Sequence, residues 1–367
     1  MRVAVITRHA INNYGSLLQA LATQKVIESL GHDCIIIDYV RYDETYQERE
    51  KTELSKKRDW NKSRIKSIVY LLLRQPESLL AGRKFEKYQR HYLNLTKRYS
   101  SKSELIKEKP KADCYVTGSD QVWGIVGRGV LDDCYCLSFT NETDKRFSLA
   151  SSFGHTDFTP SIIKYYKKWL SRYNQILVRE DTAVQRISEW GLNAKQVIDP
   201  TLMLSKSFWR KYATEKKTKP YILIYQLHNN PLLGKYAKEL ANRYDLSLIR
   251  VSQSLHQITR EGKLVWCPSI NRFLSLINNA ECMITDSFHG TAFAINLNTQ
   301  FIEVLPNNNT STRNMSILRM TNLTDRILTD VGNFGLFEKK IDFDNVNLII
   351  KRERSKSKEL LNTMLSQ

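Results

Sequence analysis

The sequence predicts an α/β protein built from two doubly wound domains, each with a parallel β-sheet. Short apolar runs of the kind that form buried parallel strands alternate with helical patterns along most of the chain. The 367 residues are too many for an average single domain and suit two. A polar, Lys-rich stretch that ends at Pro220 separates two such alternating sets and is interpreted as a linker.

The N-terminal domain is expected over residues 1–210 and begins with a β-α-β unit. The run VAVIT is the first strand, and a helical spacing of apolar residues follows it over residues 16–30. Gly31 stands where a helix C-terminal cap belongs, before the second buried strand, CIIIDYV. Later strands are predicted in the segments DCYVTGS, RFSLASSFG, QILVRE and KQVIDPTLML.

Residues 41–113 are expected to interrupt this domain as a basic helical insertion. They carry 20 Lys and Arg against 11 Asp and Glu. Trp60, Ile65 and Leu72 fall near one helical face with basic residues around it, and Pro76 is expected to break the helix. An amphipathic basic helix of this kind suits an anionic membrane interface. The alternative is a helix whose apolar face packs on the domain.

The C-terminal domain is expected over residues 211–345, and residues 346–367 are expected to form a closing helix. The predicted strands of this domain lie in the runs YILIYQL, LSLIRVS, KLVWCP, CMITDS and QFIEVL. Helical patterns separate most of these runs, which again indicates a parallel sheet.

The charge balance narrows the class of partner. Lys and Arg outnumber Asp and Glu by 56 to 38, a net charge of +18. A strongly basic protein is expected to meet nucleic acid, a membrane surface or a phosphorylated substrate, unless its basic face is merely solvated. No helix-turn-helix, RNP or zinc pattern is present, so nucleic acid is not predicted as a partner. The six cysteines are scattered without zinc spacing, and no metal is predicted.

The expected cellular location rests on the length and position of the apolar runs. The first residues lead straight into a strand, without the apolar core of a signal peptide. No run approaches the roughly 20 apolar residues of a membrane-spanning helix. We expect a cytoplasmic protein, with a peripheral position at the inner face of the cell membrane as the location that the basic insertion suggests.

Polar loops follow the predicted strands, where doubly wound folds bind ligands. After the first strand, a helix N-terminus with polar donors suits an anion, although ordinary helix capping is an equal alternative. After the strand DCYVT, a loop offers polar groups beside an aromatic ring, or else simply caps a helix. The substrate-binding residues predicted in these two loops and in the segment SLASSFGH are Asn13, Tyr14, Gly15, Ser16, Ser119, Gln121, Trp123 and Ser152, and the catalytic candidate among them is Asp120.

Two further segments hold charged residues at strand ends. Arg179 leaves the strand QILV and either forms a structural ion pair with Glu180 or clamps a carboxylate or phosphate. Asp199 precedes Pro200 and is interpreted as structural. In the stretch MITDSFHGTAFAINLN, a strand ends and a helix begins. Asp286 and His289 are catalytic candidates there, and Ser287, Gly290 and Thr291 are predicted to bind substrate, as is Arg179. A His at that place can act as a general acid or as a cation toward phosphate, or it can cap the helix.

Taken together, these motifs resemble the polysaccharide pyruvyl transferase family. The segments NNYGSLLQALATQKVI, GSDQVW, ASSFG, VRED, DPTLML and TDSFHGTAFAI occur in family order across almost the whole chain. The resemblance implies two facing Rossmann-like domains in a GT-B-like arrangement. It also implies transfer of pyruvate from phosphoenolpyruvate to two hydroxyls of a sugar, giving a cyclic ketal. The acceptors would be precursors of capsule or exopolysaccharide, linked to undecaprenyl diphosphate at the cytoplasmic face.

The chain departs from the family pattern at two places. Many members carry an Arg where this chain has Ser287, and many begin the first helix with a Gly-x-x-Gly-Asp-like loop instead of the run from Asn13 to Ser16. These departures concern the donor more than the fold. The alternative function is therefore a GT-B glycosyltransferase that uses a nucleotide sugar. A non-catalytic carbohydrate-binding protein would keep Trp123 but tolerate loss of His289.

The implied reaction needs an acid, a base and a cationic pocket. We expect His289 to be the acid or a phosphate-side cation, and Asp120 or Asp286 to be the base. Arg179 and the backbone amides at Gly15 and Gly290 would hold the anionic groups. Phosphoenolpyruvate is the donor substrate, and no cofactor is predicted.

Overall fold

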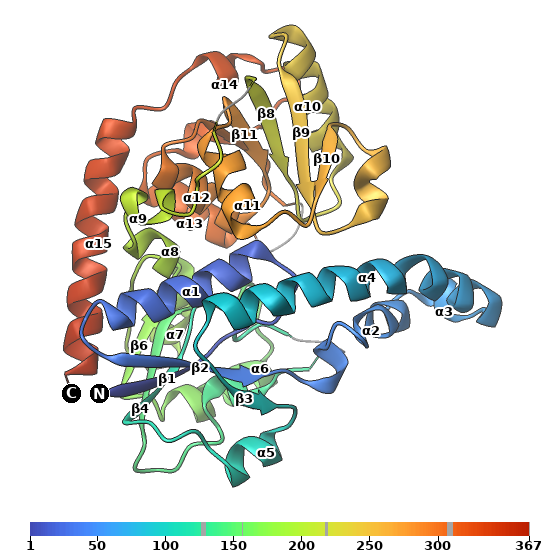
Figure 1. The fold of residues 1–367 in the computed structure, drawn as a ribbon. Helices are drawn as coiled ribbons and strands as arrows, with labels where there is room; N and C mark the ends of the chain where they lie inside the picture. The colour runs from blue at the N-terminus through green and yellow to red at the C-terminus, as the bar shows by residue number, and fades with distance from the viewer. Residues whose placement is uncertain (126–129, 156, 217–218, 307–310, 367) are drawn as a thin grey trace. The chain divides into compact units, whose positions relative to one another are not determined.

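The computed structural model describes residues 1–125, 130–155, 157–216, 219–306 and 311–366 (Figure 1). The chain divides into two compact units. Unit 1 comprises Met1–Pro200 with Leu360–Gln367, and unit 2 comprises Thr201–Glu359. Among the described residues, no helix combines the length and the apolar character needed to cross a bilayer.

Unit 1 is built on a seven-stranded parallel sheet with the order β3-β2-β1-β4-β5-β6-β7. Val3 in the central strand β1 pairs with Cys34 on one side and with Cys114 on the other. The residues from Val3 to Ile6 are completely buried, as the continuous apolar run predicts. The strands are β1 (Arg2–Ile6), β2 (Asp33–Tyr39), β3 (Leu95–Tyr99), β4 (Cys114–Thr117), β5 (Lys145–Ser151), β6 (Gln175–Val178) and β7 (Ala194–Gln196).

Helices connect these strands, as parallel pairing requires. The first begins at Tyr14 and is buried almost all round, so its sequence lacks a polar face. The helices of unit 1 are α1 (Tyr14–Glu28), α2 (Arg49–Ser55), α3 (Arg58–Asn61), α4 (Arg64–Tyr92), α5 (Lys102–Lys107), α6 (Pro160–Leu170) and α7 (Asp181–Glu189), with short 3₁₀ turns η1 (Tyr42–Glu44) and η2 (Asp133–Cys136).

The segment 41–113 differs from the expected insertion in two respects. Pro76 does not end a helix, because α4 runs through it and keeps it exposed, with the buried residues Tyr70 and Phe85 holding the helix on either side. The segment also contains β3, which pairs with β2 at the edge of the sheet. The strand has only one buried residue, Tyr99, so it lacked the apolar run by which the other strands were predicted.

Unit 2 contains a five-stranded parallel sheet with the order β10-β9-β8-β11-β12. Its strands are β8 (Tyr221–Tyr225), β9 (Ser247–Ser252), β10 (Lys263–Trp266), β11 (Cys282–Thr285) and β12 (Phe301–Glu303). Its helices are α8 (Pro200–Met203), α9 (Lys206–Arg210), α10 (Pro231–Arg243), α11 (Ile270–Asn278), α12 (Phe288–Leu297), α13 (Thr312–Met320), α14 (Gly335–Glu338) and α15 (Phe343–Leu365), with 3₁₀ turns η3 (Leu255–Thr259) and η4 (Thr324–Arg326). The first residue of α8 and the end of α15, from Leu360, belong to unit 1.

The division between the units falls after Pro200, whereas the sequence placed it at residue 210. The reason is visible in α9, which packs within unit 2. Trp209 is fully buried there, with its ring centroid 5.0 Å from that of Phe293. The side chain of Asn296 donates to the backbone carbonyls of Thr201 and Leu204 at 2.7 and 2.9 Å. The expected linker therefore begins with a packed helix.

Candidate functional site

The topology of each sheet marks one place for a ligand. In an open parallel sheet, ligands bind outside the carboxyl ends of the strands, at the point where the strand order reverses. This switch point lies between β1 and β4 in unit 1, and between β8 and β11 in unit 2. The loops that follow these four strands hold most of the site residues expected from the sequence.

In unit 1, a hydrogen bond joins the start of α1 to the loop after β4. The Ser16 hydroxyl donates to Asp120 Oδ2 at 2.9 Å. Asp120 has a left-handed backbone with φ of 78°, which costs a residue with a Cβ roughly 1–2 kcal/mol. Its carbonyl accepts from the Ser152 N–H at 3.1 Å, which ties the loop to the end of β5. Asp120 is therefore held in a defined position at the switch point.

Arg179, which follows β6, is buried among carboxylates. Its Nη1 lies 2.9 Å from Asp199 Oδ2. Glu180 and Asp120 lie farther away, at 3.7 and 3.9 Å from the guanidinium. Burial opposes the charge of Arg179, but these three carboxylates together raise its pKa above the ordinary value. Of the two alternatives left open by the sequence, this geometry favours the structural ion pair over the substrate clamp.

Three other polar residues predicted near Asp120 make contacts within the protein. Ser119 donates to Asp199 at 2.9 Å, and Ser152 donates to Glu180 at 2.6 Å, so both hydroxyls bind carboxylates around Arg179. Gln121 covers Gly154, where a Cβ would lie 2.4 Å from Gln121 Nε2.

Trp123 lies in the hydrophobic core of unit 1 and does not form the exposed aromatic surface that was expected to contact a sugar. Its side chain is 2% exposed, and its indole N–H donates to the Tyr135 carbonyl at 3.2 Å. Its ring centroid is 5.1 Å from that of Phe153. A ring enclosed in this way does not offer a face for stacking, so the aromatic residue of this motif serves packing.

The residues at the start of α1 have different roles: one caps the helix, one packs in the core and one contacts Asp120. Asn13 caps the helix by accepting from the Gly15 N–H at 2.7 Å, which is the capping alternative for this loop. Tyr14 is fully buried, with its ring centroid 5.0 Å from that of Phe85. Ser16, the last of these four residues, donates to Asp120.

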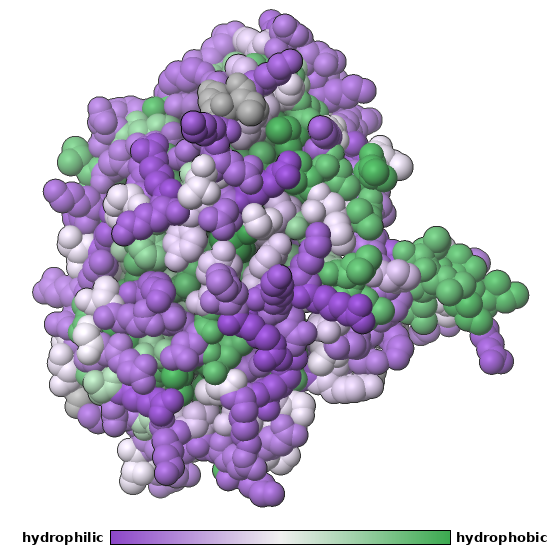
Figure 2. Space-filling model, viewed as in Figure 1, coloured by the Kyte–Doolittle hydropathy of each residue, from purple (hydrophilic) through white to green (hydrophobic). Residues whose placement is uncertain are grey.

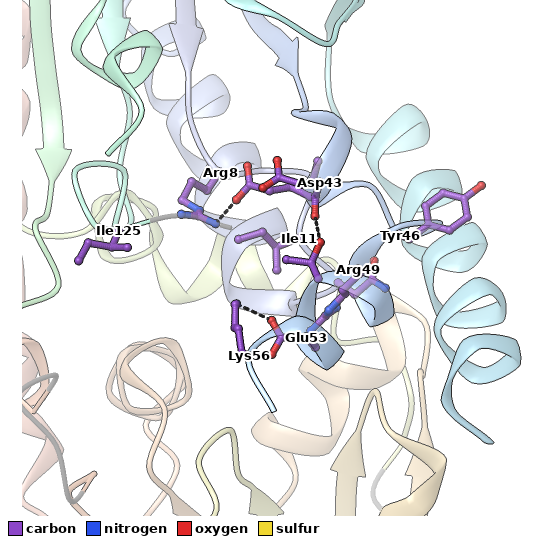
Figure 3. Close-up of a pocket in the computed structure, with 12 residues that line it drawn as sticks. Arg8, Ile11, Asp43, Tyr46, Arg49, Glu53, Lys56 and Ile125 are labelled. Atoms are coloured by element: carbon purple, nitrogen blue, oxygen red, sulfur yellow. Dashed lines mark hydrogen bonds and ion pairs between the residues drawn. The ribbon is translucent and has the colours of Figure 1, made fainter. Parts of the chain in front are cut away.

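A cavity of about 470 Å³ opens beside the same loops of unit 1 (Figure 3). Arg8 spans part of it with an ion pair to Glu44 at 2.7 Å, and burial raises the pKa of the Glu44 carboxyl. The lining combines three cationic and three acidic side chains with two isoleucines and a tyrosine, which suits an uncharged polyhydroxylated ligand. The lining residues are Arg8, Ala10, Ile11, Asn12, Asp43, Glu44, Tyr46, Arg49, Thr52, Glu53, Lys56 and Ile125.

The sequence did not predict this cavity, because its walls come from segments far apart in the chain. The loop after β1 supplies one wall, and η1 with α2 supplies the other. Ile125 from the loop after β4 completes the lining. The sequence indicated that the loops after β1 and β4 would bind a ligand. It did not indicate that α2 would line the cavity, because that depends on how the basic segment folds.

In unit 2, Asp286 joins the loops after β8 and β11. Its Oδ1 accepts from the Leu227 N–H at 2.7 Å, and its Oδ2 accepts from the His228 N–H at 2.9 Å. The imidazole Nδ1 of His228 lies 3.4 Å from the same Oδ2, and its side chain is 32% exposed. His228 was not predicted, although it directly follows the run YILIYQL, in which a strand was predicted, and the end of a strand is the position that drew attention to the other loops.

The remaining predicted residues form the first turn of α12. Ser287 caps the helix by accepting from the Gly290 N–H at 3.3 Å. His289 is the second residue of the helix and is 6% exposed, with its ring centroid 5.1 Å from that of Phe288. Thr291 is completely buried and donates to the Ser287 carbonyl at 3.1 Å. Ser287, Gly290 and Thr291 therefore have clear structural roles in building this turn.

Behind this turn lies a buried carboxyl group, Glu303 at the end of β12. The Thr291 hydroxyl and a Glu303 oxygen share a short hydrogen bond, and Asn314 donates another to Glu303 at 2.6 Å. Burial raises the pKa of Glu303 to about 8, although both hydrogen bonds act in the opposite direction. Glu303 therefore carries a proton at neutral pH and can itself donate a hydrogen bond. The sequence did not single it out, because a Glu within the run FIEVL reads as an ordinary strand residue.

In the part of the chain that the structure describes, one group brings three potential metal ligands together. The ligand atoms of Asp132, Asp133 and Cys134 lie within 4.8 Å of one another. However, Tyr39 donates to Asp132 at 2.8 Å, and Lys102 lies 2.7 Å from Asp133. Burial also raises the pKa of the Cys134 thiol, which disfavours the thiolate that binds metals. We assign no metal to this group.

Comparison with known proteins identifies the family and the fold. A family model described as polysaccharide pyruvyl transferase matches residues 13–309. No curated protein sequence matches the chain.

Three solved structures share the fold over nearly the whole chain. UDP-GlcNAc 2-epimerase from Methanocaldococcus jannaschii is 13% identical, covers 100% of this chain and 99% of its own, and has a TM-score of 0.51. The Neisseria meningitidis enzyme is 11% identical with 100% and 99% covered and a TM-score of 0.52. A putative UDP-N-acetylglucosamine 2-epimerase from Listeria monocytogenes is 8% identical with 96% and 90% covered and a TM-score of 0.52. The expected GT-B-like class with two Rossmann-like domains is confirmed.

Proposed function

Because the chain belongs to the polysaccharide pyruvyl transferase family, we propose that it transfers pyruvate from phosphoenolpyruvate to two hydroxyls of one sugar. The acceptor is a precursor of a cell-surface polysaccharide, carried on undecaprenyl diphosphate. The single observation that carries the proposal is the family match over residues 13–309. The acid-base groups at the two switch points support it.

The reaction sets defined chemical demands. The first hydroxyl oxygen forms a bond to C2 of phosphoenolpyruvate, and the enol CH₂ gains a proton and becomes a methyl group. The second hydroxyl oxygen then displaces the phosphate from C2, which closes the ketal ring and releases inorganic phosphate. Each hydroxyl loses its proton, one in exchange for the proton taken up by the methyl carbon and one to the phosphate or solvent. The site must therefore supply an acid, a base and cationic groups.

The groups of unit 2 suit the donor chemistry. We assign His289 as the proton donor or as the cation that contacts phosphate. Asp286 is less suited to act as the base itself, because each of its oxygens already accepts a backbone N–H. It is well placed to orient His228, as the carboxylate orients the His in a catalytic triad. We therefore add His228 to the acid-base groups.

The groups of unit 1 suit the acceptor. The cavity in Figure 3 offers carboxylates that can accept hydrogen bonds from sugar hydroxyls, together with Ile11 and Tyr46 as apolar surface. Asp120 lies in the same loop as Ile125, which lines that cavity. We assign Asp120 as the base that removes a proton from a sugar hydroxyl. Ser16 would hold its carboxylate in place.

The test is a thermal titration of the purified protein with phosphoenolpyruvate, beside nucleotide sugars including UDP-GlcNAc. A ligand specific for the folded state stabilises it by about 2.7 kcal/mol at a hundredfold excess over its Kd. We expect phosphoenolpyruvate to raise Tm, and His289→Ala to weaken this effect. His256→Ala, an exposed His in the same unit, should leave it unchanged.

A rise in Tm with a nucleotide sugar alone would replace this proposal with a glycosyltransferase. The feature that keeps that alternative in view is Ser287, which stands where many family members carry Arg. If neither ligand acts alone, the titration is repeated with a synthetic lipid-diphosphate sugar present, and continued absence of a shift with phosphoenolpyruvate would contradict pyruvyl transfer.

A further inference from the structure

The N-terminal half of α4 exposes a continuous apolar stripe. Ile65, Leu72 and Leu73 are 75%, 70% and 71% exposed. Ile68 and Val69 fill the turn between them and are also exposed. In Figure 1 this part of α4 extends beyond the sheet of unit 1, together with α2 and α3, and Figure 2 shows apolar side chains gathered on its end. We call the residues Ile65, Ile68, Val69, Leu72 and Leu73 the apolar stripe.

The stripe is not the face by which α4 packs on the protein. The opposite face is buried through Tyr70, Ser78 and Phe85. Tyr70 donates to Glu50 of α2 at 3.0 Å, which holds the helix on its neighbour. The helix therefore does pack on the protein, as the alternative interpretation of this segment expected, but it does so through other residues. The apolar stripe remains in contact with solvent. Contiguous exposed apolar patches such as this stripe of five large side chains are uncommon on protein surfaces and mark sites of interaction.

Basic side chains border the apolar stripe. Residues 56–74 contain seven Lys and Arg but a single acid, Asp59. Lys62, Arg64 and Lys66 are exposed and form no ion pair with any residue in the described ranges. At about 100° per residue, Arg64 and Lys66 lie on opposite sides of Ile65 around the helix axis. The long basic side chains thus flank the stripe on both edges.

We infer that α3 and the N-terminal half of α4 dock on an anionic lipid bilayer. The apolar stripe would enter the boundary between headgroups and acyl chains, as in helices that lie in the membrane plane. Arg64 and Lys66 can extend from the edges of the stripe to the phosphates above it. Each basic residue near such a surface strengthens binding about fivefold.

A second copy of the chain is a poorer occupant of this face. In a twofold dimer the same surface meets itself. Lys62, Arg64 and Lys66 would then approach the same basic residues of the other copy, with Asp59 as the single acid of the segment to balance them. An anionic bilayer instead complements both the apolar stripe and its basic edges. Docking requires neither substrate nor catalysis, so it is separate from the proposed reaction.

The test measures binding of the full chain to vesicles. Vesicles of phosphatidylglycerol and phosphatidylcholine are compared with vesicles of phosphatidylcholine alone, by flotation at 0.1 and 0.5 M NaCl. We expect binding to the anionic vesicles that weakens at least tenfold in high salt or without phosphatidylglycerol. Hydrogen exchange should show protection of residues 58–74 when anionic vesicles are added.

Two variants locate the surface. Ile65→Gln/Leu72→Gln/Leu73→Gln removes apolar area while keeping good helix formers, and should weaken vesicle binding at least tenfold. Lys62→Gln/Arg64→Gln/Lys66→Gln should weaken it by about a hundredfold, from three losses of about fivefold each. Lys351→Gln/Arg352→Gln/Lys356→Gln removes the same charge from exposed positions of α15 and should change binding little.

Equal binding to both kinds of vesicle, no binding to either, or an equal effect of the α15 variant would each overturn the proposal. So would a dimer by light scattering that the apolar-stripe variant converts to a monomer. If a stripe variant fails to fold, the lipid and salt dependence of the wild-type protein and its exchange protection decide the question.

Discussion

The carboxylate of Asp286 fixes the loop that carries His228. It accepts the backbone N–H of His228 at 2.9 Å and lies 3.4 Å from the Nδ1 of the same residue. This contact joins the carboxyl ends of β8 and β11 across the switch point of the sheet. Asp286 is almost completely buried, whereas His228 is partly exposed. Asp286 can therefore support the loop while His228 contacts a ligand.

Substitutions in this pair should separate stability from activity. In Asp286→Asn, the amide offers only one acceptor oxygen, so one of the two loop N–H groups loses its partner, at a cost of about 1–3 kcal/mol. His228→Gln should change the free energy of unfolding by less than about 0.5 kcal/mol, because the side chain is partly exposed. Its rate of pyruvyl transfer should fall by about 10²–10⁴, the usual contribution of a general acid or base.

Urea unfolding and phosphate release from phosphoenolpyruvate measure the two effects. His256→Gln, at an exposed position of the same unit, is the control for replacing a histidine outside the switch point. If His228→Gln keeps wild-type activity, then His228 is not an acid-base group, and the contact with Asp286 serves only to shape the loop.

Arg179 offers a direct contrast between structure and substrate binding. Arg179→Met removes the cation from Asp199, Glu180 and Asp120, which leaves buried carboxylates without their counter-charge. Breaking a buried ion pair in this way costs about 3–5 kcal/mol, and urea unfolding should show that loss. Arg186→Met, whose ion pair with Glu189 is exposed, should cost less than about 1 kcal/mol. A stable Arg179→Met protein with weakened phosphoenolpyruvate binding would instead favour the substrate clamp.

Much of the fold was predictable from the sequence, because strand burial leaves a local signature. The central strands β1, β2 and β8 are continuous apolar runs, and each was expected. The edge strand β3, with one buried residue, gave no such signature. The division after Pro200 was missed because it depends on the burial of Trp209 against Phe293, a contact between residues far apart in the chain.

The candidate site was predictable to the level of loops but not of roles. The motifs around Asp120 and Asp286 were located correctly at the ends of β4 and β11. The sequence did not show which of these side chains remain available to bind a ligand. Trp123 and Thr291 point inward and bind partners that only the folded chain supplies. His228 was missed because its significance comes from Asp286, 58 residues further along the chain.

Glu303 should make the stability of the protein depend on pH. Its pKa in the folded protein is about 8, above its ordinary value near 4.3. The folded state therefore binds the proton more tightly than the unfolded state. The stabilisation is complete below about pH 4.3 and is lost as pH rises to about 8, by up to about 1.4 kcal/mol per pH unit.

Urea unfolding of the wild-type protein and of Glu303→Gln between pH 5 and 9 isolates this effect. The glutamine cannot titrate, so the difference between the two free energies should change steadily up to about pH 8 and then level off. Glu338→Gln, at an exposed position, is the control for loss of one carboxylate. Parallel curves for the wild-type protein and Glu303→Gln would show that Glu303 is ionised throughout.

Gly290 should tolerate no side chain, because the first turn of α12 packs closely on the ends of β8 and β11. A Cβ at Gly290 would lie 2.5 Å from Thr285 Oγ1 and 3.1 Å from Tyr225 Cδ1. Thr285 cannot easily give way, since its hydroxyl donates to the Tyr225 carbonyl at 2.7 Å. We expect Gly290→Ala to lower the free energy of unfolding by about 1–3 kcal/mol, as other overpacked sites do. Gly332→Ala, where the nearest atom is 3.4 Å away, should change it by less than about 0.5 kcal/mol. If Gly290→Ala is as stable as the wild-type protein but loses phosphoenolpyruvate binding, the glycine serves the ligand instead of the packing of the turn.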